Sequence, residues 1–113
     1  MHELAVAREV LALVEEHARG RAVRRVVLEV GKLSGVVPDA LRFALEALTA
    51  DTPLASAVLE LQEPAGRARC RRCAAEQELE SPFAACACGS LELEWLGGRE
   101  LRLAALELEV AHV

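Results

Sequence analysis

Residues 70–89 read CRRCAAEQELESPFAACACG and contain all four cysteines of this 113-residue chain. The cysteines form two close pairs, Cys70 with Cys73 and Cys86 with Cys88, and twelve residues separate the pairs. Two such pairs joined by a short loop are typical of a zinc site, in which four thiolates surround the ion as a tetrahedron. Because four thiolates saturate zinc, the pattern predicts a structural metal site with no open position for water or substrate.

The second pair departs from the usual spacing, because only Ala87 stands between its cysteines. This spacing predicts a turn that differs from a regular Cys-x-x-Cys knuckle. Disulfides or a redox-active pair are the alternatives, but a redox dithiol usually occurs as one Cys-x-x-Cys beside a βαβ pattern, which is not found here. A segment this small has little apolar core, so bound metal would contribute folding free energy on the order of 10 kcal/mol.

Glycine and proline flank the cysteine-containing segment on both sides, at Pro64-Ala65-Gly66 and at Gly97-Gly98. We expect residues 65–98 to form an inserted lobe, called here the cysteine lobe. The main domain would then consist of residues 1–64 and 99–113, since the last strand is too short to fold without partners from the first half. Paired hinges at the two necks, and two ordinary turns without relative motion, are both compatible with these glycines.

The main domain combines helical and strand patterns. Apolar residues recur at steps of three and four over residues 3–19, and again from Pro38, which predicts two helices. The first apolar stripe consists of Leu4, Ala7, Leu11, Val14 and Ala18, widened by Val10. Alternating apolar and polar residues predict strands at 26–30 and 59–62. A last strand is predicted over 101–110, with a β-bulge near Ala104-Ala105 where the alternation shifts.

The predicted fold class is therefore α+β: a small three-stranded sheet with two helices, plus an inserted zinc-ribbon-like lobe with four cysteines. No apolar run approaches the roughly 18–20 residues of a membrane span. The N-terminus has no basic stretch before an apolar one, so we expect no secretory signal. A cytoplasmic location is expected, where thiols stay reduced and paired cysteines more often hold metal than form disulfides.

The net charge of −5 argues against a nucleic-acid-binding surface that covers the whole protein. The three aromatic residues also offer little surface on which bases could stack. Four arginines nevertheless surround the first cysteine pair, and they leave a zinc-ribbon nucleic-acid binder as an alternative: Arg67, Arg69, Arg71 and Arg72.

His2 is the histidine whose position suggests metal binding. The α-amine of Met1, the amide nitrogen of His2 and its imidazole Nδ1 lie at chelate spacing, closing a five-membered and a six-membered ring on a metal ion. Such nitrogen-rich, planar coordination suits Ni(II) or Cu(II) better than zinc. The other histidines are expected to be a helix-end surface residue (His17) and a solvated tail residue (His112).

The chain resembles the HypA/HybF family of hydrogenase maturation nickel chaperones in several segments, which follow one another in the order found in that family. They are Met1-His2-Glu3, residues 28–36 (LEVGKLSGV), residues 38–44 (PDALRFA), the two cysteine pairs with Cys88-Gly89-Ser90, and Gly98-Arg99-Glu100-Leu101 leading into residues 106–110 (LELEV). The resemblance covers essentially the whole chain. It departs from the family at the second cysteine pair, where the family usually has Cys-x-x-Cys.

The resemblance implies a non-enzymatic nickel carrier. It implies that Met1, His2 and Glu3 bind Ni(II), with Glu3 supplying a backbone nitrogen or a nearby carboxylate, and that Cys70, Cys73, Cys86 and Cys88 hold structural Zn(II). It further implies delivery to the precursor of the [NiFe] hydrogenase large subunit, or in some organisms to urease, together with a HypB-type GTPase. Binding to nucleic acid or membrane is not expected, and the chain is expected to be a monomer or weak homodimer.

The strongest rival interpretation is a zinc-stabilised protein-interaction module whose N-terminus has no nickel role. A zinc enzyme is a weaker alternative, because it would need an open ligand position and a general base.

Overall fold

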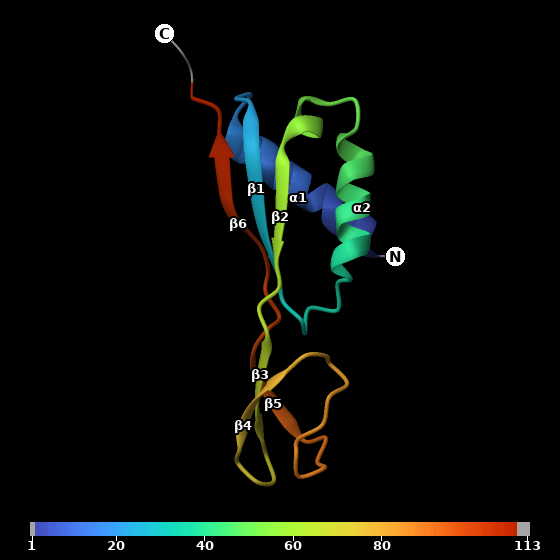
Figure 1. Ribbon diagram of the computed structural model, residues 1–113, viewed down its shortest axis with the longest axis vertical. Coiled ribbons are helices and arrows are strands. Elements are labelled where there is room, and N and C mark those ends of the chain that lie inside the picture. Colours follow the sequence, from blue (N-terminus) through green and yellow to red (C-terminus); the bar gives the residue numbers. More distant parts are fainter. Residues whose placement is uncertain (1, 111–113) are drawn as a thin grey trace.

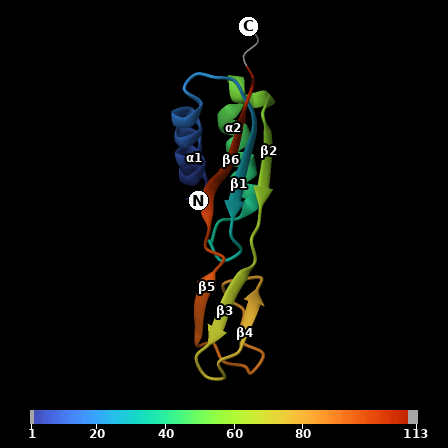
Figure 2. The ribbon, with the colours of Figure 1, turned by 90° about the vertical axis from the view of Figure 1, so that its left-hand side faces the viewer.

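The computed structural model describes residues 2–110 and places two small sheets end to end along the longest axis of the molecule (Figure 1). The molecule measures 60 × 30 × 18 Å. Figure 2, turned by a quarter turn, shows the same division: both helices lie beside the first sheet, and the second sheet lies beyond a narrow neck. The molecule is elongated because its two sheets lie one beyond the other along the longest axis.

The first sheet and both helices form the part called here the α/β body. Its elements are α1 (His2–Ala18), β1 (Val23–Val30), α2 (Pro38–Thr49), the 3₁₀ turn η1 (Pro53–Ser56), β2 (Val58–Gln62) and β6 (Leu101–Leu108). The strand order is β2-β1-β6, with β1 parallel to β2 and antiparallel to β6. The expected α+β class, with two helices and a three-stranded sheet, is confirmed.

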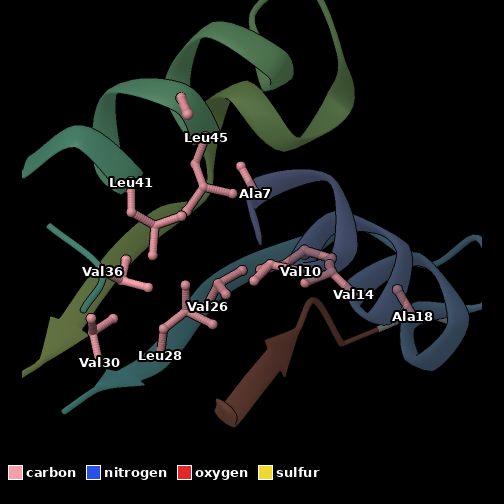
Figure 3. Close-up of a cluster of buried hydrophobic side chains, with 12 residues drawn as sticks. Ala7, Val10, Val14, Ala18, Val26, Leu28, Val30, Val36, Leu41 and Leu45 are labelled. Carbon is pink, nitrogen blue, oxygen red and sulfur yellow. The ribbon is translucent and has the colours of Figure 1, made fainter. Parts of the chain in front are cut away.

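The core of the α/β body lies between the helices and one face of the sheet (Figure 3). Val14 of α1, Leu41 of α2 and Leu28 of β1 are at most 1 % exposed. The predicted helical stripe is correct except at its first residue, since Leu4 is 45 % exposed and Glu3 is buried in its place. The start of α1 is thus rotated so that a carboxylate, rather than leucine, faces the molecule.

The opposite face of the sheet is covered by ion pairs instead of a helix. The Arg25 guanidinium of β1 lies 2.5 Å from a carboxylate oxygen of Glu60 and 2.8 Å from one of Glu107. Arg102 lies 2.6 Å from Glu29 in the same way. These pairs connect the central strand to both neighbours and leave this face polar.

The predicted bulge in the last strand is confirmed. Val27 of β1 pairs with Ala105, and the next residue, Leu28, pairs with Leu103, so Ala104 is passed over. The extra residue restores the inward direction of Leu103 and Leu106, which both pack against the core.

The cysteine lobe has its own antiparallel sheet, ordered β4-β3-β5, built from β3 (Gly66–Cys70), β4 (Glu76–Leu79) and β5 (Leu93–Gly97). Its small core consists of Leu33, Ala68 and Leu79, with Ala84, Leu93 and Trp95 packed against them. Leu33 comes from the loop after β1, so the α/β body contributes a residue to the core of the lobe.

Close packing of glycines marks the neck between the two sheets. A Cβ atom added to Gly98 would lie 2.4 Å from the Cα of Gly66, and one added to Gly31 would lie 2.1 Å from the Gly98 carbonyl oxygen. Gly98 also has a φ of +104°, which side chains with L chirality rarely adopt. Three backbone segments therefore meet at a point where there is no room for side chains.

Within residues 2–110, neither helix combines the length and the apolar character needed to cross a membrane.

Candidate metal centre

The four cysteines come from two turns that face each other at the far end of the cysteine lobe. Cys70 is the last residue of β3, and Cys73 follows in the turn that leads to β4. Cys86 and Cys88 lie in the loop between β4 and β5. Cys70 and Cys86 are buried, whereas Cys73 and Cys88 are exposed, so each pair contributes one buried and one exposed cysteine.

The sulfur atoms are spaced as four ligands of one metal ion. Sγ of Cys73 lies 3.5 Å from Sγ of Cys86, Sγ of Cys70 lies 3.7 Å from Sγ of Cys88, and all four lie within 4.8 Å of one another. With Zn–S bonds of about 2.3 Å, the edges of a regular tetrahedron of sulfurs are about 3.8 Å long. The donor set and its spacing therefore fit a four-coordinate thiophilic ion such as zinc.

Backbone N–H groups in the two turns point at the buried sulfurs. The amides of Arg72 and Cys73 donate to Sγ of Cys70 at 3.4 and 3.5 Å, and the amide of Cys88 donates to Sγ of Cys86 at 3.5 Å. The Cys73 amide is the main reason why the pKa of Cys70 is lowered to about 6. The donors to Cys70 favour its thiolate, which is the form that binds metal. Despite the Cys88 amide, the pKa of Cys86 is raised to about 12, because burial and the neighbouring thiols disfavour its charged form.

The one-residue spacing of Cys86 and Cys88 is accommodated by a tight turn. The Cys86 amide donates to the Ser90 carbonyl at 2.9 Å, and the Gly89 amide donates to the Cys86 carbonyl at 2.8 Å. Gly89 adopts a φ of +92°, which lets the chain reverse within these few residues. The shortened pair thus reaches the same cluster as the regular one.

Carboxylates offset much of the positive charge of the arginine cluster beside the first pair. Arg67 and Arg69 lie 3.0 and 3.4 Å from Glu76, and Arg69 and Arg71 lie 3.8 and 4.0 Å from Glu94. A phosphate backbone would have to compete with these glutamates. The arrangement argues against the nucleic-acid alternative.

In the α/β body, α1 begins at His2. The His2 side chain is 57 % exposed, and its Nε2 lies 3.5 Å from a carboxylate oxygen of Glu3. The same oxygen, Oε2 of Glu3, accepts a hydrogen bond of 3.1 Å from the amide of Val37, the residue that precedes α2. Glu3 therefore connects the start of α1 to the start of α2.

Neither of the other two histidines was expected to bind metal. His17 lies near the other end of α1, where its Nδ1 is 2.8 Å from the Leu13 carbonyl oxygen, as expected for a helix-end histidine. Met1 and His112 lie outside the described residues.

Sequence reasoning missed the contribution of Val37. Its amide acts through the backbone, and an unremarkable valine side chain carries no signal of that role. The burial of Glu3 could have been suspected from its position three residues before Val6 and four before Ala7, on the inward side of the helix.

The Val37 amide is the main reason why the pKa of Glu3 is lowered from 4.5 to about 2. A carboxylate with a lowered pKa stabilises the fold fully above its unfolded value and loses that contribution as the pH falls from about 4.5 to about 2. We expect the melting temperature of Glu3→Gln to lie below that of wild type at neutral pH, and the difference to shrink over this acidic range. A difference that is independent of pH would contradict a role for the negative charge.

Comparison with known proteins gives consistent matches over nearly the whole chain. The model of the family described as "Hydrogenase/urease nickel incorporation, metallochaperone, hypA" matches residues 1–108. The Hydrogenase maturation factor HypA of Trichormus variabilis is 47 % identical over 109 residues, which is 96 % of each chain. The protein of the same name from Geotalea uraniireducens is 44 % identical over 96 % of this chain and its own full length.

The fold comparison agrees with the sequence comparison. The solution structure of the Ni metallochaperone HypA from Helicobacter pylori superposes with a TM-score of 0.64 at 26 % identity, covering 96 % of this chain and 97 % of that one. Family model, curated relatives and solved structures all span both the α/β body and the cysteine lobe. The chain belongs to the HypA family of hydrogenase and urease nickel-incorporation metallochaperones.

Proposed function

We propose that this protein binds Ni(II) reversibly at its N-terminus and delivers it to the precursor of the [NiFe] hydrogenase large subunit, in the cytoplasm and together with a HypB-type GTPase. Urease is the alternative recipient. The nickel ligands would be the α-amine of Met1, the amide and imidazole of His2, and Glu3. Cys70, Cys73, Cys86 and Cys88 would hold Zn(II), which keeps the cysteine lobe folded. The role is delivery rather than catalysis.

The observation that supports this proposal most directly is the environment of His2. The first amides of an α-helix have no acceptor within the helix, so the His2 amide is not committed to helical hydrogen bonding. Nε2 of His2 lies beside the Glu3 carboxylate, which favours the tautomer whose Nδ1 lone pair is free for a metal ion. An exposed imidazole, held on its outer nitrogen, suits a chelate with the preceding nitrogens.

The same location favours release. The positive end of the α1 dipole lies at this site and opposes the charge of the cation. Few side chains contribute, and the site lies at a chain end. We expect micromolar affinity, equivalent to about −8 kcal/mol, which allows a carrier to hold nickel without trapping it.

Nickel titration of untagged, zinc-loaded protein tests the proposal. Wild type should bind about one Ni(II) per chain at micromolar concentration. His2→Ala should weaken binding at least 100-fold, because it removes the imidazole and with it the six-membered chelate ring. An N-terminal extension that blocks the α-amine should have a comparable effect.

His17→Ala is the matched control, because it removes a histidine from the same helix at the opposite end. It should bind nickel like wild type. If His2→Ala also binds like wild type, the N-terminal site is wrong. If wild type binds no nickel, a zinc-stabilised interaction module is the function that remains.

A further inference from the structure

The loop between β1 and α2, residues 31–37, is called here the bridging loop because its two ends belong to different parts of the molecule. It leaves the α/β body after β1, but Leu33 is 4 % exposed and packs into the core of the cysteine lobe with Ala68 and Leu79. The fit is tight, since a Cβ atom added to Gly66 would lie 2.5 Å from Cγ of Leu33. The Leu33 side chain is therefore packed tightly among residues of the cysteine lobe.

The backbone of the bridging loop is fixed to both strands of the neck. Gly31 donates to the Glu100 carbonyl at 2.6 Å, Lys32 donates to the Pro64 carbonyl at 2.9 Å, and Leu33 donates to the Gly98 carbonyl at 2.7 Å. The Lys32 ammonium also pairs with the Glu80 carboxylate of the lobe. The position of this half of the loop thus depends on the lobe being folded.

The other half of the bridging loop ends at the N-terminal site. Val36 is buried in the core of the α/β body. Val37 follows, and its amide donates to the Glu3 carboxylate that lies beside the His2 imidazole. Only three residues lie between Leu33, which packs in the core of the lobe, and Val37, whose amide holds Glu3 in the α/β body. The bridging loop is therefore short, and hydrogen bonds hold it at both ends.

We propose that Leu33 is a positioning residue for the nickel site, through which the folded, metal-loaded cysteine lobe sets the affinity of the N-terminus for nickel. The inference rests on the nickel-carrier function proposed above. When Leu33 sits between Ala68 and Leu79, the bridging loop presents the Val37 amide to Glu3, and Glu3 in turn orients His2. Without this packing of Leu33 the bridging loop relaxes, and nickel binding must first restore the arrangement of Glu3 and His2.

The coupling is reciprocal by thermodynamic necessity. If the folded lobe favours nickel binding at the N-terminus, nickel bound there favours the folded lobe by the same factor. Couplings of this kind typically change affinity by about 5–150-fold. Because one contact residue is removed rather than the whole lobe, we expect a change of about tenfold for Leu33 variants, at the lower end of that range.

Leu33→Ala in the full, zinc-loaded chain tests the proposal. Nickel affinity should fall about tenfold while the zinc content stays at one per chain and the helical circular dichroism is unchanged. The near-ultraviolet and visible absorption of bound nickel should also change, because His2 is presented differently. Leu33→Met, which keeps the volume, should restore wild-type affinity. Leu33→Val serves instead of Leu33→Ala if the latter loses zinc, with a smaller loss of affinity expected.

Leu93→Ala is the matched control, since Leu93 of β5 packs against the same small core but is not one of the two residues between which Leu33 sits. With zinc bound, it should change nickel affinity less than twofold. If the zinc-loaded Leu33 variants bind nickel with wild-type affinity and spectrum, the proposal is overturned although the nickel-carrier function stands. If wild type itself binds no nickel, the function proposed above fails, and this inference fails with it.

Discussion

Removal of zinc should unfold the cysteine lobe and leave the α/β body folded. Apart from the cysteines, the apolar core of the lobe has three buried residues among those that the structure describes, Leu33, Ala68 and Leu79. The α/β body, in contrast, has a core of twelve buried residues that includes both helices. Metal binding by a small cysteine module contributes on the order of 10 kcal/mol at neutral pH, which is more than this little core can replace.

The single tryptophan of the chain makes this prediction easy to measure, because Trp95 lies in β5 and packs against the lobe core. On zinc removal with a chelator, or in Cys70→Ser, the Trp95 emission should shift to the red and lose its cooperative thermal transition. Helical circular dichroism should largely remain, since α1 and α2 lie outside the lobe.

Ser81→Ala is a suitable control for the lobe. Ser81 lies in the same β4–β5 loop and accepts a hydrogen bond from the Phe83 amide, but it is not part of the cysteine cluster. It should retain zinc and the wild-type emission of Trp95. A zinc-free protein with unchanged Trp95 emission would show that the lobe folds on its apolar core alone.

Replacement of Gly98 by alanine should destabilise the protein by about 2–6 kcal/mol, because two separate costs add. The φ of +104° is strained for any residue with a Cβ atom. In addition, the new Cβ would lie 2.4 Å from the Gly66 Cα and 3.0 Å from its nitrogen, and neither backbone atom can move without opening the neck. Chemical denaturation of the zinc-loaded protein measures the loss.

The neighbouring glycine provides the control for this experiment. A Cβ atom added to Gly97 has its nearest neighbour at 3.8 Å, an ordinary van der Waals distance, and no unusual φ stands against it. Gly97→Ala should therefore change the free energy of unfolding by less than about 0.5 kcal/mol. Equal effects at the two positions would contradict the packing described for the neck.

The comparison of sequence and structure shows which features local patterns can predict. The helices, the three strands of the first sheet and the skipped residue in β6 follow from periodicity, because each has one buried and one exposed face. The cysteine cluster was predictable from spacing alone. The strands of the lobe were not, since β3 has mostly small residues at its buried positions and β4 is mostly polar, so neither shows a clear apolar alternation.

The neck glycines illustrate a limit of sequence reasoning. Their positions beside the cysteine segment were compatible with hinges or with ordinary turns, and nothing in the sequence indicated that Gly66 and Gly98 pack against each other so closely that a side chain is excluded. The role of Leu33 was equally hidden. Its sequence neighbours belong to the α/β body, but its packing partners are contributed by residues more than 30 positions away. Non-local packing of this kind leaves no periodic signal.

The insertion of the lobe between β2 and β6 also bears on how the larger sheet is assembled. β6 completes that sheet at the edge of β1, but the chain must first traverse roughly 40 residues after β2, and the cost of closing a loop rises with its length. A folded lobe holds both ends of this stretch at the neck and reduces the free segment to a few residues, which lowers the closure cost by about 1–2 kcal/mol. A metal ion held by the four cysteines would thereby favour the pairing of β6 with β1 without contacting either strand.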